Sequence, residues 1–494
     1  MSDCTYRDMP VKFDNSFAKL PERFYVRQSP VPVADPALVR VNYPLADFLG
    51  IDPAWLESET GIHVVAGNQV PDGADPIATV YAGHQFGSWN PRLGDGRAIL
   101  LGEVIAEDGG RYDIQLKGSG LTPFSRGGDG RAPLGPILRE YIVSEAMAAL
   151  GIPTSRTLAA VTTGESVYRE QKLAGGVLAR VARSHIRIGT LQYFTSVNDL
   201  DGLKLLVDHV IARHYPDQLG AESPALSLLE QVIRSQASLV ARWQGVGFIH
   251  GVMNTDNMLL SGETIDYGPC AFMDGYDSAA VYSSIDHGGR YSFRNQPAIA
   301  HWNLACLAQT LMPLLAPDEE QASDIAQQAL DCFPALFMQE YLATLRAKLG
   351  FATSRQDDDA LIQDFLDLLE SNRCDFTLAF RRLSELAAGT ATIQPLFDFP
   401  ESFAGWLTRW RERCSQETIG ELERQAQMMA TNPALIPRNH LVEAAISQAY
   451  DNDFTLFHQL TDRLSKPFDY ASEDEFLATP PRPEQIVQQT FCGT

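Results

Sequence analysis

The side chains best suited to chemistry lie between residues 248 and 268. Asn257 offers an amide oxygen and Asp266 a carboxylate, and both follow His250 at short spacing. Oxygen donors of this kind bind hard divalent cations, which neutralise phosphate charge. A simple turn is the alternative for Asp256 and Asn257, because both residue types favour turns. The register with His250 and Asp266 favours the metal site.

The same residues follow the order of the catalytic loop in protein-kinase-like enzymes, His-x-Asp-x4-Asn and then Asp-Phe-Gly. Val252 stands where that motif has its catalytic Asp, and valine cannot accept a proton. Ordinary phosphorylation by that route is therefore impaired. Asp256 is the neighbouring carboxylate that could act instead. We expect a short hairpin over residues 258–265 to connect this loop to Asp266.

A second set of residues could bind phosphates. Gly94 and Gly96 lie in a turn before a predicted strand, where backbone N–H groups can approach an anion. Arg97 adds a guanidinium group that can donate two hydrogen bonds to a phosphate. Lys117 ends the next strand and Glu140 lies in the helix that follows. In kinase-like folds a Lys in this order contacts phosphates and the Glu fixes it. A hairpin turn, a surface Lys and an ordinary helical Glu are the alternatives.

Two further features lie nearby. The glycine-rich residues 118–131 could fold over a ligand, with Asp129 and Gly130 at the turn, or form a flexible surface loop. Arg180 and Arg187 occur in a largely apolar segment, where a charge is costly unless it meets an anion. A triphosphate would supply that anion, and so would Asp or Glu side chains.

Composition narrows the class of protein. The chain has 39 Lys+Arg against 62 Asp+Glu and a net charge of −23 at pH 7, which argues against partners such as nucleic acid or an anionic membrane. It has no run of about 18 apolar residues, as a membrane span requires, and no secretory signal. Seven cysteines without a CxxC pair argue against a zinc ribbon or a disulfide scaffold. We expect a soluble, cytoplasmic enzyme.

Periodicity separates a β-rich part from a helical part. Strands are predicted at residues 98–104, 111–117, 166–170 and 176–183, and helices at 35–49 and 136–150. After about residue 195, helical patterns cover residues 226–246, 302–315, 319–350, 357–372, 401–430 and 441–450, with a strand-like block at 247–276. We expect an α+β fold with an N-terminal extension (1–75), a β-rich N-lobe (76–194) and a helical C-lobe with a C-terminal tail (195–494).

With these motifs the chain resembles the selenoprotein O family of protein adenylyltransferases. The similarity is strongest at residues 78–97, 250–257 and 266–274, extends to 13–17 and 489–494, and covers nearly the whole chain. It implies a protein-kinase-like, bilobal pseudokinase fold that binds ATP in a reversed orientation. It also implies transfer of AMP to Ser, Thr or Tyr hydroxyls of proteins, and UMP transfer favoured by Mn²⁺ is a variant in the family.

The resemblance implies roles for single residues. Asp256 would be the catalytic base, Glu140 would position Lys117, and Asn257 with Asp266 would bind Mg²⁺ or Mn²⁺. The residues that would contact ATP are Gly94, Gly96, Arg97, Lys117, Asp129, Gly130, Arg180, Arg187 and Asp266.

Two cysteines carry another expectation from the family. Cys270 lies four residues after Asp266, and Cys492 is an ordinary cysteine in a tail where some members have selenocysteine. The resemblance suggests a regulatory disulfide between them, with a glutaredoxin- or thioredoxin-type redox partner, and two free thiols are the alternative.

Two other functions stay open. A small-molecule phosphotransferase of the aminoglycoside-kinase type is one, although Val252 argues against it. A non-catalytic, nucleotide-binding pseudokinase is the other, although the intact Asn257 and Asp266 argue against that.

Overall fold

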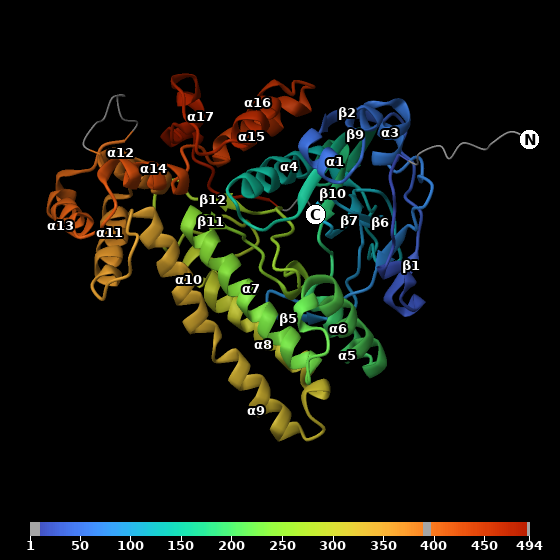
Figure 1. The fold of residues 1–494 in the computed structure, drawn as a ribbon. Helices are drawn as coiled ribbons and strands as arrows, with labels where there is room; N and C mark the ends of the chain where they lie inside the picture. The colour runs from blue at the N-terminus through green and yellow to red at the C-terminus, as the bar shows by residue number, and fades with distance from the viewer. Residues whose placement is uncertain (1–9, 389–396, 492–494) are drawn as a thin grey trace, which may run out of the picture.

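A large antiparallel sheet forms the N-terminal part of the computed structural model, which describes residues 10–388 and 397–491 (Figure 1). Its strand order is β1-β3-β6-β7-β10-β9-β2, and β8 pairs on β10. The strands are β1 (Tyr25–Arg27), β2 (Ala37–Val41), β3 (Ile77–Thr79), β6 (Ala98–Ile105), β7 (Arg111–Lys117), β8 (Ala132–Pro133), β9 (Arg156–Tyr168) and β10 (Lys172–Ala182). The two edge strands of this order, β1 and β2, come from the first 75 residues.

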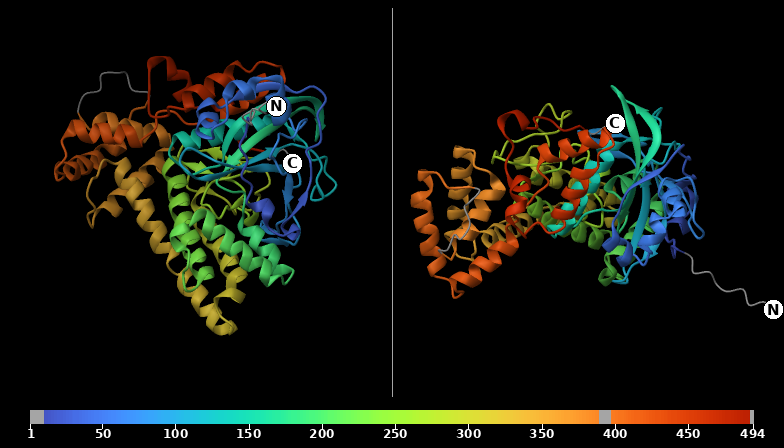
Figure 2. Two further views of the ribbon diagram at one scale, coloured as in Figure 1. Left: turned by 45° about the vertical axis from the view of Figure 1, so that its right-hand side comes forward. Right: turned by 90° about the horizontal axis from the view of Figure 1, so that it is seen from above.

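Helices cover both faces of this sheet (Figures 1 and 2). One face packs on α4 (Leu134–Ala149), which is itself covered by α15 (Asn439–Tyr450) and α16 (Thr455–Leu464). The other face packs on α1 (Tyr43–Phe48), α2 (Pro53–Glu57) and α3 (Glu59–Val65). Helix α4 therefore lies between the sheet and the C-terminal helices, with β9 and β10 as its neighbours in the sheet.

The predicted β6 and β7 strands and the helix α4 are confirmed, with α4 beginning two residues early. Two other predictions need correction. The helical pattern at residues 35–49 is instead strand β2 followed by α1, because Val39 and Val41 alternate inward and Asn42 caps the helix by accepting from the N–H of Leu45. The strand at residues 166–170 is only the end of β9, which begins at Arg156.

The C-terminal part is helical, as predicted (Figure 2). Its long elements are α5 (Ile188–Ser196), α6 (Leu200–His214), α7 (Pro224–Val246), α8 (Gln296–Leu315), α9 (Glu319–Leu330), α10 (Phe333–Lys348), α11 (Asp358–Asn372), α12 (Phe376–Leu386), α13 (Ala404–Ser415) and α14 (Glu421–Thr431). The pattern at 319–350 is two helices, because Pro334 starts α10. Gly420 likewise separates α13 from α14 within 401–430.

One helix of the described residues, Phe293–Leu315, is long and apolar enough to cross a membrane by length and composition, whereas none was expected. The part of it that forms α8 packs against α5, α7 and α9. These neighbours place α8 in the core of the helical part, which accounts for its apolar composition.

The strand-like block at residues 247–276 is largely irregular. It contains only β11 (Phe248–Ile249) paired with β12 (Ala271–Phe272). The hairpin predicted at residues 258–265 is wrong, because its two arms pair elsewhere: Leu259 bridges to Arg187 and Thr264 to Thr154. The loop is thereby attached to the segments that follow β10 and α4.

Candidate active site

A buried group of four charged residues joins the two parts of the chain. Lys117 Nζ lies 2.5 Å from Glu140 Oε2 and 3.1 Å from Asp266 Oδ1. Arg180 donates from Nε to Glu140 Oε1 at 2.6 Å, and its NH2 lies 3.3 Å from Asp266 Oδ1. The alternative of a surface Lys is therefore excluded, and the structure gives Arg180 carboxylate partners.

Glu140 is the fully buried centre of this group, with 1% of its side chain exposed. Burial alone would raise the pKa of Glu140, but Arg180 and Lys117 hold it below its ordinary value. The carboxylate is therefore ionised at neutral pH. Each of its oxygens has one cation, and this arrangement fixes both Lys117 and Arg180.

Asp266 is more accessible, with 30% of its side chain exposed. Burial acts to raise the pKa of Asp266, yet Lys117, Arg180, Arg187 and Arg97 together hold it well below its usual range. Its φ of +69° is rare for a residue other than glycine. Strained residues of this kind cluster at functional sites, so Asp266 is a strong candidate for a reactive position.

His250 holds the backbone next to Asp266. Its Nε2 bonds the carbonyl of Ile265 at 2.8 Å, and its Nδ1 accepts from the N–H of Val252 at 3.3 Å. A carbonyl can only accept, so Nε2 carries the proton, and burial lowers the pKa of His250 and keeps the ring neutral. The histidine thus joins the 250–257 loop to the Asp266 loop.

Asn257 lies in a 3₁₀ turn, Thr255–Asn257. Its Nδ2 donates to the carbonyl of Val252 at 3.0 Å, which leaves its Oδ1 as an oxygen donor. Val252 itself is buried and apolar. The alternative prediction, that Asp256 and Asn257 form a simple turn, is therefore partly right. These residues do form a turn, but the turn also leaves Oδ1 of Asn257 as an oxygen donor.

Asp256 is buried, with 7% exposure, and its carboxylate lies against a small hairpin formed by residues 83–90. Burial raises the pKa of Asp256 to about 6, with Arg187 acting in the opposite direction. Gln85 Nε2 donates to its Oδ2 at 3.2 Å, while its Oδ1 has no partner among the described residues. A carboxylate of this kind can accept a proton near neutral pH.

Arg187 lies beside Asp256, but it binds the backbone carbonyl of Asp256 and not the carboxylate. Its NH1 donates to the carbonyl of Asp256 at 2.7 Å, and its NH2 lies 3.8 Å from Asp95 Oδ1. The guanidinium also stacks over the ring of Tyr81, 4.5 Å from the centroid. Protein groups therefore satisfy much of its charge, and it stays within reach of the same site.

The glycine turn at residues 94–96 is closed by the loop at 118–131. Gly94 has a φ of +66°, and a Cβ there would stand 2.2 Å from the ring of Phe124. Thr122 Oγ1 donates to the carbonyl of Asp95 at 2.6 Å, and Ser125 Oγ donates to that of Gly96 at 2.5 Å. The loop is thus packed on the turn and is not a free surface loop.

Arg97 follows this turn and is half-buried, close enough to Asp266 to lower its pKa. Asp129 and Gly130 lie farther along the loop. Asp129 is 42% exposed and pairs with Arg169 at 2.9 Å, at the end of the β9–β10 hairpin. Among the described residues, no contact joins Asp129 to the four-residue group.

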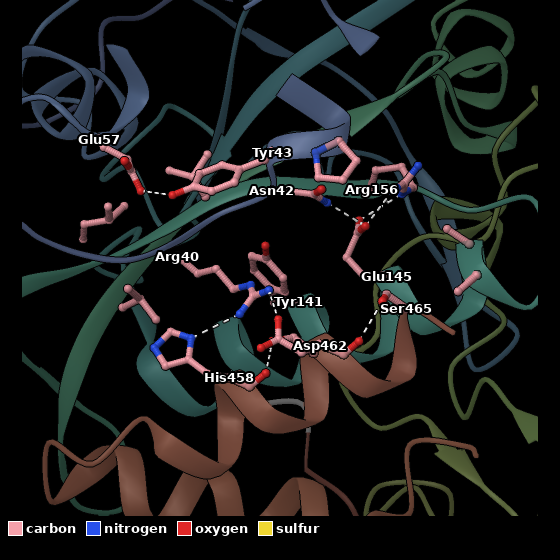
Figure 3. Close-up of a pocket in the computed structure, with 17 residues that line it drawn as sticks. Arg40, Asn42, Tyr43, Glu57, Tyr141, Glu145, Arg156, His458, Asp462 and Ser465 are labelled. Carbon is pink, nitrogen blue, oxygen red and sulfur yellow. Dashed lines mark hydrogen bonds and ion pairs between the residues drawn. The ribbon is translucent and has the colours of Figure 1, made fainter. Parts of the chain in front are cut away.

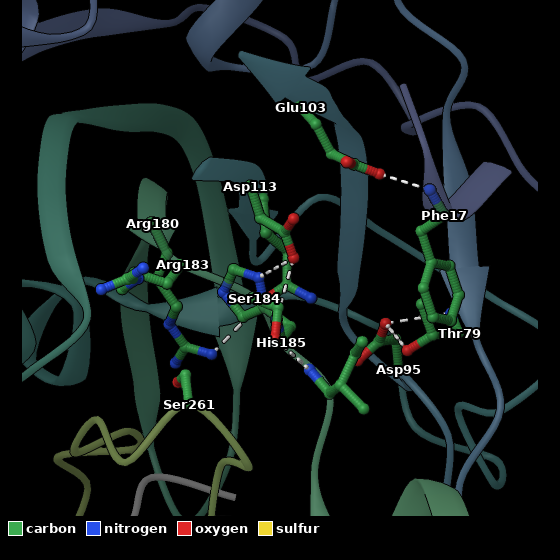
Figure 4. A network of polar contacts seen from close by, with 12 residues as sticks. Phe17, Thr79, Asp95, Glu103, Asp113, Arg180, Arg183, Ser184, His185 and Ser261 are labelled. Carbon is green, nitrogen blue, oxygen red and sulfur yellow. Dashed lines mark hydrogen bonds and ion pairs between the residues drawn. The ribbon is translucent and has the colours of Figure 1, made fainter. Parts of the chain in front are cut away.

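Several positioning residues carry no recognisable sequence signal. Asp113 accepts from His185 and from Arg213 of α6, and Glu103 accepts from the N–H of Phe17 at 2.6 Å (Figure 4). This network ties the segment before Arg187 to β7 and α6. Asp95 accepts from Thr79 in the same region, and only the spacing Gly-Asp-Gly draws attention to it.

A cavity of about 760 Å³ lies elsewhere, between β2, α4 and α16 (Figure 3). Its charged side chains already pair with one another: Arg156 binds Glu145 at 2.6 Å, and Arg40 binds Asp462 at 2.5 Å. It contains none of the predicted site residues. This cavity therefore does not mark the candidate active site.

Cys270 is buried, and its Sγ contacts the carbonyl of Tyr267 at 3.3 Å. Burial raises the pKa of Cys270 to about 12, so the thiol is protonated. The tail approaches this segment, because Thr490 Oγ1 donates to the carbonyl of Pro269 at 2.6 Å. Cys492 lies outside the described residues, and Cys270 is a free thiol within them.

Comparisons with known proteins identify the family of the chain. The family model of protein adenylyltransferase SelO matches residues 8–465. A protein nucleotidyltransferase YdiU of Rhodopseudomonas palustris (strain BisB5) is 58% identical over 486 residues, covering 98% of this chain and 99% of the relative. The YdiU of Bradyrhizobium diazoefficiens is 57% identical over 485 residues, with the same coverage. The chain belongs to the protein adenylyltransferase SelO family, and it is a protein nucleotidyltransferase.

Proposed function

We propose that this enzyme transfers AMP from ATP to Ser, Thr or Tyr hydroxyls of proteins, on a protein-kinase-like fold that binds ATP in the reversed orientation. The observation that carries the proposal is the group formed by Lys117, Glu140, Arg180 and Asp266, which lies near the buried carboxylate of Asp256. A kinase-like lysine and glutamate are present, whereas Val252 replaces the usual base. The cationic side chains of Lys117 and Arg180 come from the sheet, whereas the oxygen donors Asp256 and Asp266 come from the loops.

The donor set fits a divalent metal. Asn257 Oδ1 and the carboxylate of Asp266 are hard oxygen ligands of the kind that Mg²⁺ and Mn²⁺ prefer. No group of three or more His, Cys, Asp or Glu side chains that could together hold a metal ion occurs among the described residues. Mg²⁺ commonly takes few protein ligands and completes its shell with water and phosphate. A bound divalent ion would neutralise phosphate charge at the reacting centre.

The side chains of the sheet would hold the β- and γ-phosphates. Arg97, Lys117, Arg180 and Arg187 converge on Asp266, and each contributes to its low pKa. If the outer phosphates lie against these cations, the α-phosphorus faces the loop that carries Asp256. The full set proposed to contact ATP is Gly94, Gly96, Arg97, Lys117, Asp129, Gly130, Arg180, Arg187 and Asp266.

Asp256 would act as the base. The hydroxyl of the acceptor gives its proton to the Asp256 carboxylate, and its oxygen forms a bond to the α-phosphorus. The bond from that phosphorus to the bridging oxygen breaks, and pyrophosphate leaves with the bonding electrons. Assistance of this kind is typically worth ~10²–10⁴-fold in rate.

A labelling experiment tests the proposal. The enzyme is incubated with a divalent metal, mixed cell protein and ATP that carries its label on either the α- or the γ-phosphate. Protein-bound α-label supports the proposal. Label transferred only from the γ-position to a small molecule would support a phosphotransferase, and ATP binding without transfer would support a non-catalytic pseudokinase.

The same assay with UTP tests nucleotide choice. We propose that UMP transfer is a second activity, favoured by Mn²⁺ over Mg²⁺. Measuring α-label transfer from UTP and from ATP with each metal gives the preference directly.

We further propose that Cys270 and Cys492 form a regulatory disulfide. A glutaredoxin- or thioredoxin-type partner would reduce it, and we propose a bacterial cytoplasm as the location of the protein. The bond between Thr490 and Pro269 supports the disulfide, since it brings the described end of the tail to the residue before Cys270. Mass spectrometry of the oxidised protein tests it through the cross-linked peptide, which Cys492→Ser should abolish.

A further inference from the structure

A small hairpin lies directly on the loop that carries Asp256. It consists of β4 (Gly83–Gln85) and β5 (Ser88–Asn90). The N–H of His84 donates to Thr255 Oγ1 at 2.7 Å, and the N–H of Phe86 donates to Asn254 Oδ1 at 3.0 Å. These backbone bonds fix the hairpin in register with the residues that precede Asp256.

Two residues of the hairpin touch the carboxylate itself. Gln85 Nε2 lies 3.2 Å from Asp256 Oδ2, and only the N–H end of the amide can donate to a carboxylate. On the other side, a Cβ at Gly83 would stand 2.9 Å from Oδ1. Glycine is therefore the residue that leaves the carboxylate in place, and Gln85 determines which oxygen is occupied.

This contact leaves the two carboxylate oxygens unequal. Oδ2 accepts from Gln85, whereas Oδ1 is buried without a partner among the described residues. Oδ1 is enclosed, since a Cβ at Gly83 would stand 2.9 Å from it. The hydrogen bond from Gln85 to Oδ2 therefore fixes how the carboxylate is oriented.

We propose that Gln85 is the positioning residue of the base: it binds Oδ2 of Asp256 and so fixes the orientation in which the carboxylate meets the acceptor hydroxyl. This inference rests on the proposed function. Gln85 acts through Asp256 and does not touch the nucleotide. Its loss should therefore slow transfer while leaving nucleotide binding unchanged.

A double-mutant cycle tests this role. Gln85→Met keeps the length of the side chain and removes the N–H. A hydrogen bond to a charged group contributes enough free energy that its loss should lower the kcat of α-label transfer about tenfold. The KM for ATP should not change. In an Asp256→Asn background the same substitution should change the rate by less than about twofold, because the carboxylate it positions is gone.

Two further variants complete the design. Gln69→Met makes the same substitution at an exposed glutamine and should leave transfer unchanged. If Gln85→Met proves unstable, Gly83→Ala displaces the carboxylate from the other side and should also lower kcat only when Asp256 is present.

A second readout uses the acceptor. A Tyr hydroxyl is more acidic than a Ser hydroxyl and needs less help from a base. Gln85→Met and Asp256→Asn should therefore both raise the ratio of transfer to a Tyr peptide over a Ser peptide, which general destabilisation would not do.

The outcomes separate two failures. The wild type could transfer α-label normally while Gln85→Met lowers kcat by the same factor with Asp256 and with Asn at position 256. That result would overturn the role of Gln85 and leave the proposed function standing. No α-label transfer by the wild type would overturn the proposed function and this inference with it.

Discussion

Asp266 Oδ1 lies 3.1 Å from Nζ of Lys117, so a carboxylate suited to a metal ion is held by a lysine suited to phosphate. Glu140 holds the same lysine from the other side, at 2.5 Å. In the proposed function, Lys117 would move from Asp266 to a phosphate oxygen and would keep Glu140 as its second partner. The pair holds the ionised Asp266 and the Lys117 side chain in place.

Asp266→Asn tests the carboxylate in this pair. The amide keeps the shape of the side chain but loses the charge that a metal requires, so transfer should fall by about 10²-fold or more. Lys117 and Arg180 keep Glu140 as a partner, so the fold should survive. Rates of α-label transfer together with circular dichroism check this, and unchanged transfer would remove Asp266 from the site.

Glu140→Gln tests the buried centre of the group. Removing one partner of a buried ion pair costs about 3–5 kcal/mol of unfolding free energy, because it leaves the cations uncompensated. The control is Glu443→Gln, whose side chain is 40% exposed and pairs with the neighbouring Arg139. A partly exposed pair of that kind is worth about 0–1 kcal/mol. Urea denaturation measures both, and equal losses would contradict the account.

Gly94→Ala tests the phosphate-binding turn. Gly94 and Gly109 both have positive φ, at +66° and +76°, so alanine costs a similar amount of backbone strain at each, roughly 1 kcal/mol. Only at Gly94 would the Cβ collide with Phe124, whereas nothing lies within 4 Å at Gly109. Gly94→Ala should therefore weaken ATP binding, and Gly109→Ala should not. Titration calorimetry with ATP gives the comparison.

Glu263 gives a pH prediction away from the reacting centre. It is buried, accepts from Ser261 Oγ at 2.7 Å and from the N–H of Arg183 at 3.0 Å, and burial raises its pKa to about 7. The folded state therefore holds a proton that the unfolded state releases near pH 4.5. Stability from this group is complete below about pH 4.5 and is lost as pH rises toward 7.

At about 1.4 kcal/mol per pKa unit, the loss is about 3 kcal/mol. Glu263→Gln should remove this slope from the pH dependence of the unfolding free energy. The exposed Glu230→Gln should leave it unchanged. An identical slope in wild type and Glu263→Gln would contradict the assignment.

The sequence identified the charged side chains that the structure brings together better than it identified their supports. Lys117, Glu140 and Asp266 were found because their types and order follow a known chemical pattern. Gln85 was not, because a glutamine has no distinctive chemistry and its contact with Asp256 spans 171 residues of sequence. The same holds for Asp113 and Arg213, whose bond spans 100 residues.

Local patterns failed where tertiary pairing decides the structure. Residues 37–41 became strand β2 because β9 offers an edge for pairing, and no local signal reveals that edge. Leu259 and Thr264 looked like two arms of one hairpin, yet each pairs with a distant segment. The end of α4 was predicted better, because Gly151 acts locally, whereas the break between α9 and α10 was missed.

The orientation of the nucleotide is the central claim. A crystal structure of the enzyme with Mg²⁺ and a non-hydrolysable ATP analogue measures it directly, by comparing the distances from the α- and γ-phosphorus atoms to Asp256. The account predicts that the α-phosphorus is the nearer, with the outer phosphates on Lys117 and Arg180. A γ-phosphorus nearest Asp256, with the adenine buried between the two parts of the chain, would contradict it.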